Sequence, residues 1–143
     1  MLVVVALGGN ALLRSGEPRD LDHQRARVRA AARALAPVLR THDVVLTHGN
    51  GPQVGELARL ARAGGDPTPP LDILDAESEG SIGYLLAQEL HNAVPERAVV
   101  GVLTQVVVDV DDPAFTHPDK PIGERAEGRV VASPLPRRIV EVD

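Results

Sequence analysis

Two glycine-rich segments are the first part of this sequence whose residue types could do chemistry. Each follows an apolar run: a Gly-Gly-Asn segment follows residues 2–7, and a Gly-Asn-Gly segment comes after residues 44–46. Glycine lets an anion approach the main chain closely, and N–H groups at the start of a helix carry partial positive charge. With nearby amide side chains as neutral donors, the two segments predict a pocket for a small oxyanion. The residues of this predicted pocket are Gly8, Gly9, Asn10, Gly49, Asn50, Gly51 and Gln53.

The same glycines have a simpler interpretation, because a Gly-Gly pair after a strand often makes only a tight turn. Neither segment is a dinucleotide fingerprint, since the first lacks a third glycine and no acidic residue follows at a suitable spacing. Neither is a phosphate-binding P-loop, since no Gly-Lys-Ser or Gly-Lys-Thr occurs. A later segment, Gly80-Ser81-Ile82-Gly83, could let a helix approach the same pocket. Spacing alone therefore leaves both an anion site and a pair of turns open.

Lys120 is the only lysine among 15 basic residues, and it lies in a loop between Pro118 and Pro121. Arginine supplies the positive charge everywhere else in the chain. A compact, strongly hydrated ammonium held on a loop is what phosphoryl transfer uses to offset developing negative charge. The alternative is that a single lysine occurs here by chance, and residue type does not decide between the two.

Other candidates for chemistry have competing structural interpretations. His48 could act as a general base, or could simply belong to the glycine-rich turn. The five histidines show no i, i+4 pairing, so we predict no metal site. Asp109, Asp111 and Asp112 could bind a cation, but we favour a solvated turn. Ser133 has no nearby histidine and is not predicted to be a nucleophile.

Composition excludes several classes of protein. The chain has 143 residues, no cysteine, a net charge of −5 and a pI near 5.5. With Tyr84 and Phe115 as its two aromatic residues, it lacks the basic and stacking surface of a nucleic-acid-binding protein. The apolar run at 1–7 is too short to span a bilayer and has no basic flank or cleavage site of a signal peptide. We therefore expect a cytoplasmic protein with no membrane or nucleic-acid partner.

The order of the predicted elements indicates an α/β protein. Strand, helix, strand, two helices and strand is typical of a parallel sheet with helices on both faces, whose strands are buried on both sides. Ligands of such sheets bind at the carboxyl ends of the strands, where the glycine-rich segments lie. Three strands are few for such a sheet, so we expect pairing with another copy or membership of something longer. The predicted strands span 2–7, 44–46, 98–108 and, briefly, 129–132, and the helices span 21–40, a stretch beginning at Pro52, and 72–94. Asp20 is the predicted N-cap of the first helix, which Pro37 should kink or whose regular part it should end early. The predicted buried face of the third helix is Ile82, Leu85, Leu86 and Leu90.

Five segments, taken in order, resemble the carbamate kinase family. The resemblance covers nearly the whole chain. It implies the open αβα sandwich of the amino-acid kinase superfamily, with a mainly parallel sheet, and phosphoryl transfer between ATP and carbamate, often run from carbamoyl phosphate and ADP toward ATP, with magnesium. The segments are Ala6-Leu7-Gly8-Gly9-Asn10-Ala11-Leu12, Thr47-His48-Gly49-Asn50-Gly51-Pro52-Gln53-Val54-Gly55, Gly80-Ser81-Ile82-Gly83-Tyr84, Leu103-Thr104-Gln105-Val106-Val107-Val108-Asp109 and Lys120-Pro121-Ile122-Gly123.

The resemblance also implies roles for individual positions. The first glycine-rich segment matches the loop that cradles the transferred phosphoryl group, and the second matches the loop that lines the carbamoyl phosphate pocket. Lys120 falls on the family's catalytic lysine, in a protruding loop that closes over the substrate. The nucleotide site belongs to the family's second half, which this sequence lacks. We accordingly expect Lys120 to be catalytic and the following residues to bind substrate or phosphate: Gly8, Gly9, Asn10, Gly49, Asn50, Gly51, Gln53, Gly80 and Ser81.

Departures from the family pattern shape the functional hypotheses. The protruding region, about 109–132, is shortened, and Glu79 stands where the pattern has glutamine. We therefore expect residues 1–143 to be the N-terminal, substrate-binding half of a carbamate kinase-like domain, inactive alone and associated with a second copy or with the missing half. The alternatives are a non-catalytic anion-binding or regulatory module and a kinase for another small acid, although the match over 48–55 counts against the last.

Overall fold

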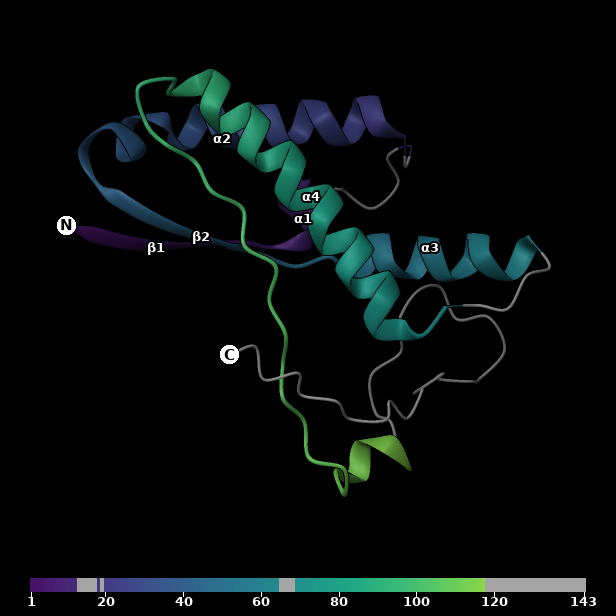
Figure 1. The fold of residues 1–143 in the computed structure, drawn as a ribbon. Helices are drawn as coiled ribbons and strands as arrows, with labels where there is room; N and C mark the ends of the chain where they lie inside the picture. Colours follow the sequence, from purple (N-terminus) through teal and green to yellow (C-terminus); the bar gives the residue numbers. More distant parts are fainter. Residues whose placement is uncertain (13–17, 19, 65–68, 118–143) are drawn as a thin grey trace.

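Two short parallel strands place the glycine-rich segments at one edge of the molecule. In the computed structural model, which describes residues 1–12, 18, 20–64 and 69–117, strand β1 (Leu2–Leu7) pairs with strand β2 (Asp43–His48). The register runs from Leu2 opposite Asp43 to Leu7 opposite His48. Both carboxyl ends therefore lie side by side, as Figure 1 shows. The parallel α/β arrangement expected from the sequence is confirmed.

The two strands are covered on one face only. Along both strands, half-buried residues alternate with exposed ones. Leu2 is 65% exposed, Val4 67% and Val45 46%, whereas Leu7 and Leu46 pack against the hydrophobic core. Because side chains alternate between the faces of a strand, helices cover one face and the other carries exposed apolar groups. The prediction that both strands are buried on both sides is wrong for this structure.

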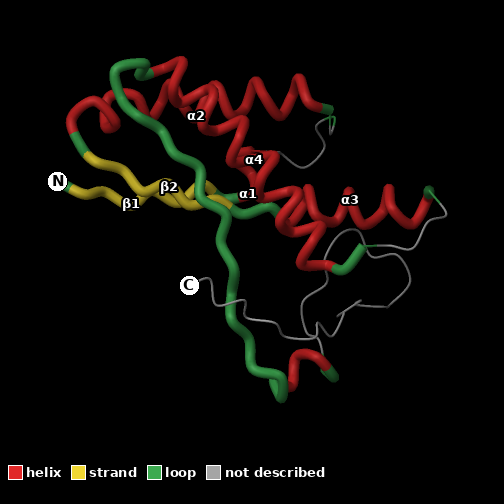
Figure 2. The backbone as a smooth tube through the Cα atoms, viewed as in Figure 1, coloured by secondary structure: helices red, strands yellow, loops and turns green. Residues whose placement is uncertain are grey.

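Three long helices make up most of the described chain, and Figure 2 shows how they are arranged. Helix α2 (Leu21–Thr41) begins at the predicted N-cap, where the Asp20 carboxylate accepts a hydrogen bond from the His23 N–H. Helix α3 (Gly51–Ala63) starts with Pro52 in its first turn, as expected, and helix α4 (Leu71–Ala93) runs obliquely across the molecule. The one-turn helix α1 (Gly9–Leu12), which the sequence analysis did not predict, follows β1 directly.

The hydrophobic core lies between α2 and α4, with contributions from α1. All four positions predicted for the buried face of the third helix are buried, so that prediction is confirmed. Small residues of α2 allow the two helices to approach, since Ala32 and Ala36 are buried there with Val28. No helix in the described residues is long and apolar enough to cross a bilayer. The core cluster consists of Leu12, Val28, Ala32, Ile82, Leu85, Leu86 and Leu90.

The third predicted strand, 98–108, does not form a strand. These residues have no regular structure, and all of 100–110 are exposed, with Val102 73% and Val106 83% exposed. Figure 2 shows this segment as a loop that crosses in front of the two strands and leads to the 3-10 turn η1 (Pro113–Phe115). An apolar, β-branched run becomes a strand only where a neighbouring strand supplies hydrogen bonds. The described residues provide none beside it. The short strand expected at 129–132 lies outside them.

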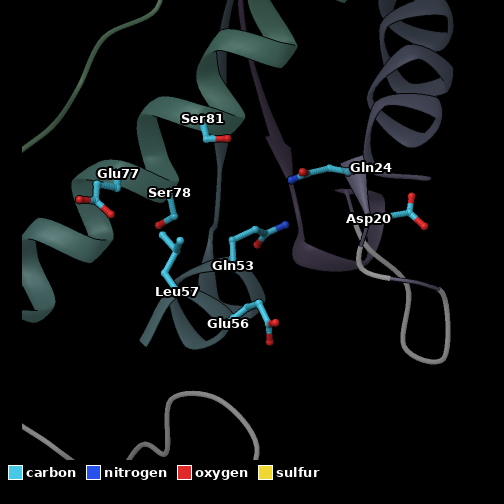
Figure 3. Close-up of a pocket in the computed structure, with 8 residues that line it drawn as sticks. All are labelled: Asp20, Gln24, Gln53, Glu56, Leu57, Glu77, Ser78 and Ser81. Atoms are coloured by element: carbon cyan, nitrogen blue, oxygen red, sulfur yellow. The ribbon is translucent and has the colours of Figure 1, made fainter. Parts of the chain in front are cut away.

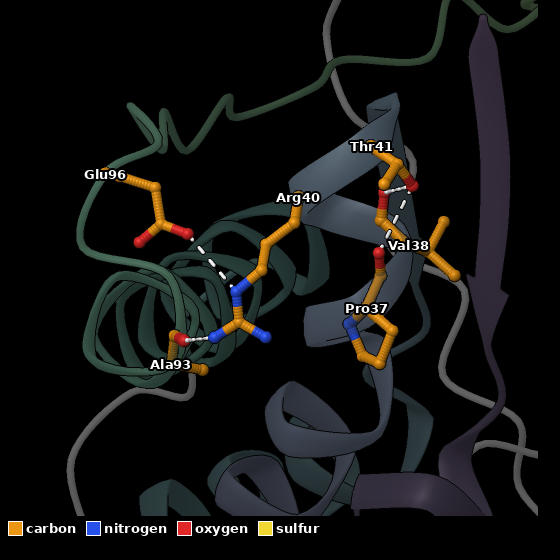
Figure 4. Close-up of polar contacts among 6 residues, drawn as sticks. All are labelled: Pro37, Val38, Arg40, Thr41, Ala93 and Glu96. Atoms are coloured by element: carbon orange, nitrogen blue, oxygen red, sulfur yellow. Dashed lines mark hydrogen bonds and ion pairs between the residues drawn. The ribbon is translucent and has the colours of Figure 1, made fainter.

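Pro37 does not end α2, which continues four residues further to Thr41. Of the two expected effects of Pro37, a kink or an early end to the regular part of the helix, the early end is therefore wrong. Two hydrogen bonds stabilise the last turn (Figure 4). Within α2, Thr41 Oγ1 donates to the Pro37 carbonyl at 3.2 Å, and between the helices Arg40 Nη2 donates to the Ala93 carbonyl at 3.0 Å. Arg40 Nε also donates to Glu96 Oε1 at 3.2 Å. These bonds fasten the end of α2 to the end of α4.

A partly buried ion pair joins the same two helices. Arg29 donates through Nε and Nη2 to the two carboxylate oxygens of Glu89, at 2.9 and 3.1 Å. The Glu89 side chain is only 6% exposed, whereas that of Arg29 is 50% exposed. Hydrogen bonding to Arg29 lowers the pKa of Glu89 and outweighs the opposing effect of burial. The charged form of Glu89 therefore stabilises the folded chain.

Glu89→Gln is expected to remove part of the acid sensitivity of folding. Because the pKa of Glu89 is lowered in the folded state, its contribution is complete above the ordinary value of 4.5 and disappears as pH falls through the lowered value. The difference in unfolding free energy between wild type and variant should thus shrink from about pH 6 to about pH 3 in urea titrations. Glu96→Gln is the matched control, since Glu96 also bonds an arginine but is 54% exposed. A constant difference across this range for Glu89→Gln would contradict the assignment.

Candidate functional site

The carboxyl ends of β1 and β2 bring the two glycine-rich segments to the same edge. Since Leu7 and His48 are partners in the register, Gly8 and Gly49 follow at neighbouring positions. The space beside Gly8, Gly49 and Gly51 is open, because a Cβ atom built on any of them would meet nothing within 4 Å. The main chain of both segments is therefore accessible to a small ligand. Gly9 and Asn10 lie in α1, immediately after Gly8.

Asn50 connects the second glycine-rich segment to α4. Its carbonyl accepts hydrogen bonds from the N–H groups of Gln53 and Val54, at 2.9 and 3.0 Å, which starts α3. Its side-chain Nδ2 donates to Asp75 Oδ1 at 2.6 Å and to Ser78 Oγ at 2.9 Å. The amide that was predicted to donate to an anion is thus engaged within the protein, where it fixes the position of the loop.

Ser78 was missed by the sequence analysis. It is a buried polar residue, 2% exposed, and its hydroxyl donates to the Asp75 carbonyl at 2.9 Å while it accepts from Asn50. Ser78 precedes the predicted site residue Ser81 by three positions on the same helix, so the two share one face. That spacing was the available signal.

A cavity of about 240 Å³ lies where the start of α2, the first half of α3 and the first half of α4 meet. Figure 3 shows side chains from all three helices around it. Of the predicted site residues, the cavity brings together Gln53 and Ser81. The complete lining is Asp20, Gln24, Gln53, Glu56, Leu57, Glu77, Ser78 and Ser81.

The lining of this cavity is acidic. Three carboxylates contribute to it, and none of the lining residues is basic. Hydrogen bonds from the His23 main chain and ring lower the pKa of Asp20, which keeps that carboxylate charged. Glu56 pairs with Arg59, Oε1 to Nη2, at 2.6 Å. Among the residues that the structure describes, no three acidic or histidine side chains gather as a metal ion would need. The cavity is suited to neutral hydrogen-bonding groups, and the open glycine edge to an anion.

Gln53 carries buried polar atoms without partners. Both its Nε2 and its Oε1 are inaccessible to solvent, and neither has a hydrogen-bond partner in the described part of the chain. The same is true of Nδ1 of His48, at the end of β2. Buried polar atoms are almost always paired in folded proteins, so the unpaired atoms of Gln53, which lines the cavity, point to a bound ligand or water there.

The glycines of α4 face the other elements of the site. A Cβ atom on Gly83 would lie 4.0 Å from His48 Nε2, and one on Gly80 would lie 3.8 Å from Leu103 Cδ2. Glu79, next to Gly80, accepts hydrogen bonds from the N–H and hydroxyl of Thr104, at 3.2 and 2.8 Å. This residue, which departs from the family pattern, therefore holds the segment around Thr104 against α4.

Comparison with known proteins shows which family the chain resembles. A model of the amino acid kinase family matches residues 1–110, more than three quarters of the chain. The chain belongs to the amino acid kinase family. It is 48% identical to the carbamate kinase of Haemophilus influenzae, over 99% of this chain and 54% of that protein. It superposes on the structure of Giardia carbamate kinase with a TM-score of 0.78 at 43% identity, and on that of Giardia lamblia carbamate kinase bound to AMP-PNP with a TM-score of 0.75 at 42% identity.

These relatives confirm the family resemblance and the fold class predicted from the sequence. They also confirm that the chain is shorter than the proteins it resembles. It spans about half the length of the curated relatives it matches. Each structural alignment with a Giardia protein includes 85% of this chain and covers 43% or 41% of the Giardia chain.

Several residues considered in the sequence analysis of this amino acid kinase chain do not line the cavity or the glycine edge in the described structure. Lys120 and Ser133 lie outside the described residues, as does the greater part of the shortened region at 109–132. Within the described part of that region, Asp109 Oδ1 accepts from the Asp111 N–H at 3.0 Å and Asp112 Oδ1 from the Ala114 N–H at 2.8 Å. Such short-range bonds are typical of a polar turn.

Proposed function

We propose that this chain is the substrate-binding half of a carbamate kinase-like phosphotransferase. The reaction moves the γ-phosphoryl group of ATP onto a carbamate oxygen, giving ADP and carbamoyl phosphate, and often runs in reverse, toward ATP. The observation that carries the proposal is the meeting of the two glycine-rich segments at one open edge of the parallel strands, in a chain 48% identical to a carbamate kinase.

In this proposal, the main chain of the glycine edge binds the phosphoryl group. Gly8, Gly49 and Gly51 leave room for close approach, and Asn50 keeps the second loop in place through α4. Lys120 supplies the positive charge that offsets negative charge in the transition state. Catalysis of this kind rests mainly on positioning and electrostatics, so no acid or base residue is required.

The nucleotide site is proposed to lie apart from the cavity and the glycine edge. The acidic cavity does not suit the phosphates of ATP, and the described residues do not group as magnesium ligands, so we derive no step through the metal. We propose that ATP or ADP, with magnesium, binds mainly to the half of the fold that this chain does not span. The relative bound to AMP-PNP supports this, because it has more than twice the length that the alignment covers. Association with that half or with a second copy, in the cytoplasm, completes the proposal.

A non-catalytic module that binds carbamoyl phosphate is the second candidate function. One observation favours it: the chain spans about half of its relatives and exposes apolar groups on one face of its strands. Such a module would keep the glycine edge and lose turnover. A kinase for another small acid has less support, because the curated relatives it matches include carbamate kinases at 48% and 46% identity.

The purified chain is expected to bind carbamoyl phosphate but to form no ATP from carbamoyl phosphate and ADP in a coupled assay. Binding should raise its melting temperature, since a ligand of the folded state stabilises it. Addition of the C-terminal half of the Haemophilus influenzae carbamate kinase should restore ATP formation. Turnover by the 143-residue chain alone would contradict the half-site proposal, and binding without restored turnover would favour the module. Absence of binding would overturn both.

A further inference from the structure

Gln53 occupies a distinctive position beside the proposed substrate site. It is the third residue of α3, two positions after the second glycine-rich segment, and it lines the cavity together with Ser78 and Ser81 (Figure 3). Its carboxamide Nε2 and Oε1 are both buried, and no partner for either exists among the described residues. A partner for this group must accept one hydrogen bond and donate another.

The carbamoyl group has that chemistry. Its carbon carries an NH₂ donor and a C=O acceptor side by side, in the same arrangement as the glutamine carboxamide. Two such groups can form a reciprocal pair, in which each N–H donates to the other carbonyl. An acetyl group has a methyl in place of NH₂ and can form only one of these bonds.

The charges of the cavity favour the same orientation of the substrate. Asp20, Glu56 and Glu77 line it, so a phosphoryl group would be repelled there, whereas an NH₂ group would be attracted. The phosphoryl end is then directed to the open glycine edge, where α3 begins. The carbamoyl end points toward α3 and α4.

We propose that Gln53 is the residue that recognises the carbamoyl group, through a reciprocal pair of hydrogen bonds, and thereby distinguishes carbamoyl phosphate from other acyl phosphates. This inference rests on the proposed function, because it assigns one end of the proposed substrate. It adds an orientation and a specificity determinant to it.

The test compares two stable analogues that differ in one group. Phosphonoacetamide keeps the NH₂ of carbamoyl phosphate, and acetonylphosphonate carries a methyl in its place. By calorimetry on the full 143-residue chain, wild type should bind the amide at least about tenfold more tightly, because the methyl compound leaves Gln53 with an unpaired atom. Gln53→Met should bind both compounds with similar affinity.

Gln88→Met is the matched control. Gln88 also lies on a helix of the site, but its Nε2 donates to Tyr84 Oη at 2.8 Å, and it does not line the cavity. This variant should keep the preference for the amide. Gln53→Leu, which removes both the donor and the acceptor, provides a second substitution at the site if the methionine variant does not fold.

The outcomes separate the two proposals. If wild type binds both analogues equally, the Gln53 carboxamide pairs with water and not with the ligand. The inference about Gln53 is then overturned, while the proposed anion site is unaffected. If the folded Gln53→Met or Gln53→Leu variant retains the preference, another residue recognises the NH₂ group and the inference is likewise overturned. If wild type binds neither analogue nor carbamoyl phosphate, the proposed function fails as well.

Discussion

Lys120→Ala is expected to lower the rate of ATP formation by about 100- to 1,000-fold in the chain combined with the remaining half of a relative. Lys120 is proposed to offset charge that develops on the transferred phosphoryl oxygens, so its loss should fall mainly on the transition state. The expected signature is therefore a decrease in kcat with a smaller change in the KM for carbamoyl phosphate. Steady-state kinetics with coupled detection of ATP measure both.

Two further substitutions make this expectation specific. Lys120→Arg keeps the charge but replaces a compact ammonium with a planar guanidinium, so partial activity is expected. Arg125→Ala removes a positive charge five residues along the same segment and should leave kcat within about twofold if general electrostatics is not the cause. A Lys120→Ala enzyme with the kinetics of wild type would remove Lys120 from the mechanism.

Local patterns in the sequence were sufficient to predict the helices and the glycine edge. Asp20 and Pro52 carry start signals that depend on nearby main-chain groups alone, and α2 and α3 begin where those signals place them. The apolar spacing of α4 likewise identified its buried face, including Ile82 and Leu90. The apolar runs before them placed both glycine-rich segments at strand ends, and the parallel register of β1 and β2 brings them together.

What the sequence could not supply depends on partners that lie far away along the chain. The run at 98–108 has the composition of a buried strand, but composition does not indicate whether a neighbouring strand is present. The same limit applies to β1 and β2, whose apolar residues on one face are exposed. The prediction of doubly buried strands failed because no described element covers this face.

The polar network of the site could not be predicted from the sequence for a related reason. Asn50 has the residue type of an anion donor, but its side chain reaches 25 positions along the chain to Asp75 and 28 to Ser78. The cavity is formed by three helices that converge only in the folded chain, so Glu56 and Glu77 gave no signal as site residues. Residue types at strand ends predict the place of a site better than they predict which side chains remain available to a ligand.

The position of α4 links folding to the site, because one face of the helix packs in the core while the neighbouring face carries Glu77, Ser78 and Ser81 into the cavity. Ile82 is completely buried next to these residues. It lies in the same cluster as Val28 of α2 and Leu12 of α1, so it joins three elements around one point. A void at this position would loosen the helix that holds both Asn50 and the cavity lining.

Ile82→Ala is accordingly expected to lower the free energy of unfolding by about 2–5 kcal/mol, since it removes buried methyl groups and leaves a cavity. Ile73→Ala is the matched control on the same helix: Ile73 is 47% exposed, and its replacement should cost less than about 1 kcal/mol. Urea unfolding followed by circular dichroism measures both, and Ile82→Val, with an expected loss of about 0.5–1.5 kcal/mol, covers the case in which the alanine variant does not fold. Equal losses at positions 73 and 82 would contradict the core described for α4. Because a domain of this size has a total stability of only about 5–15 kcal/mol, a loss at the upper end would unfold much of the chain and remove ligand binding with it.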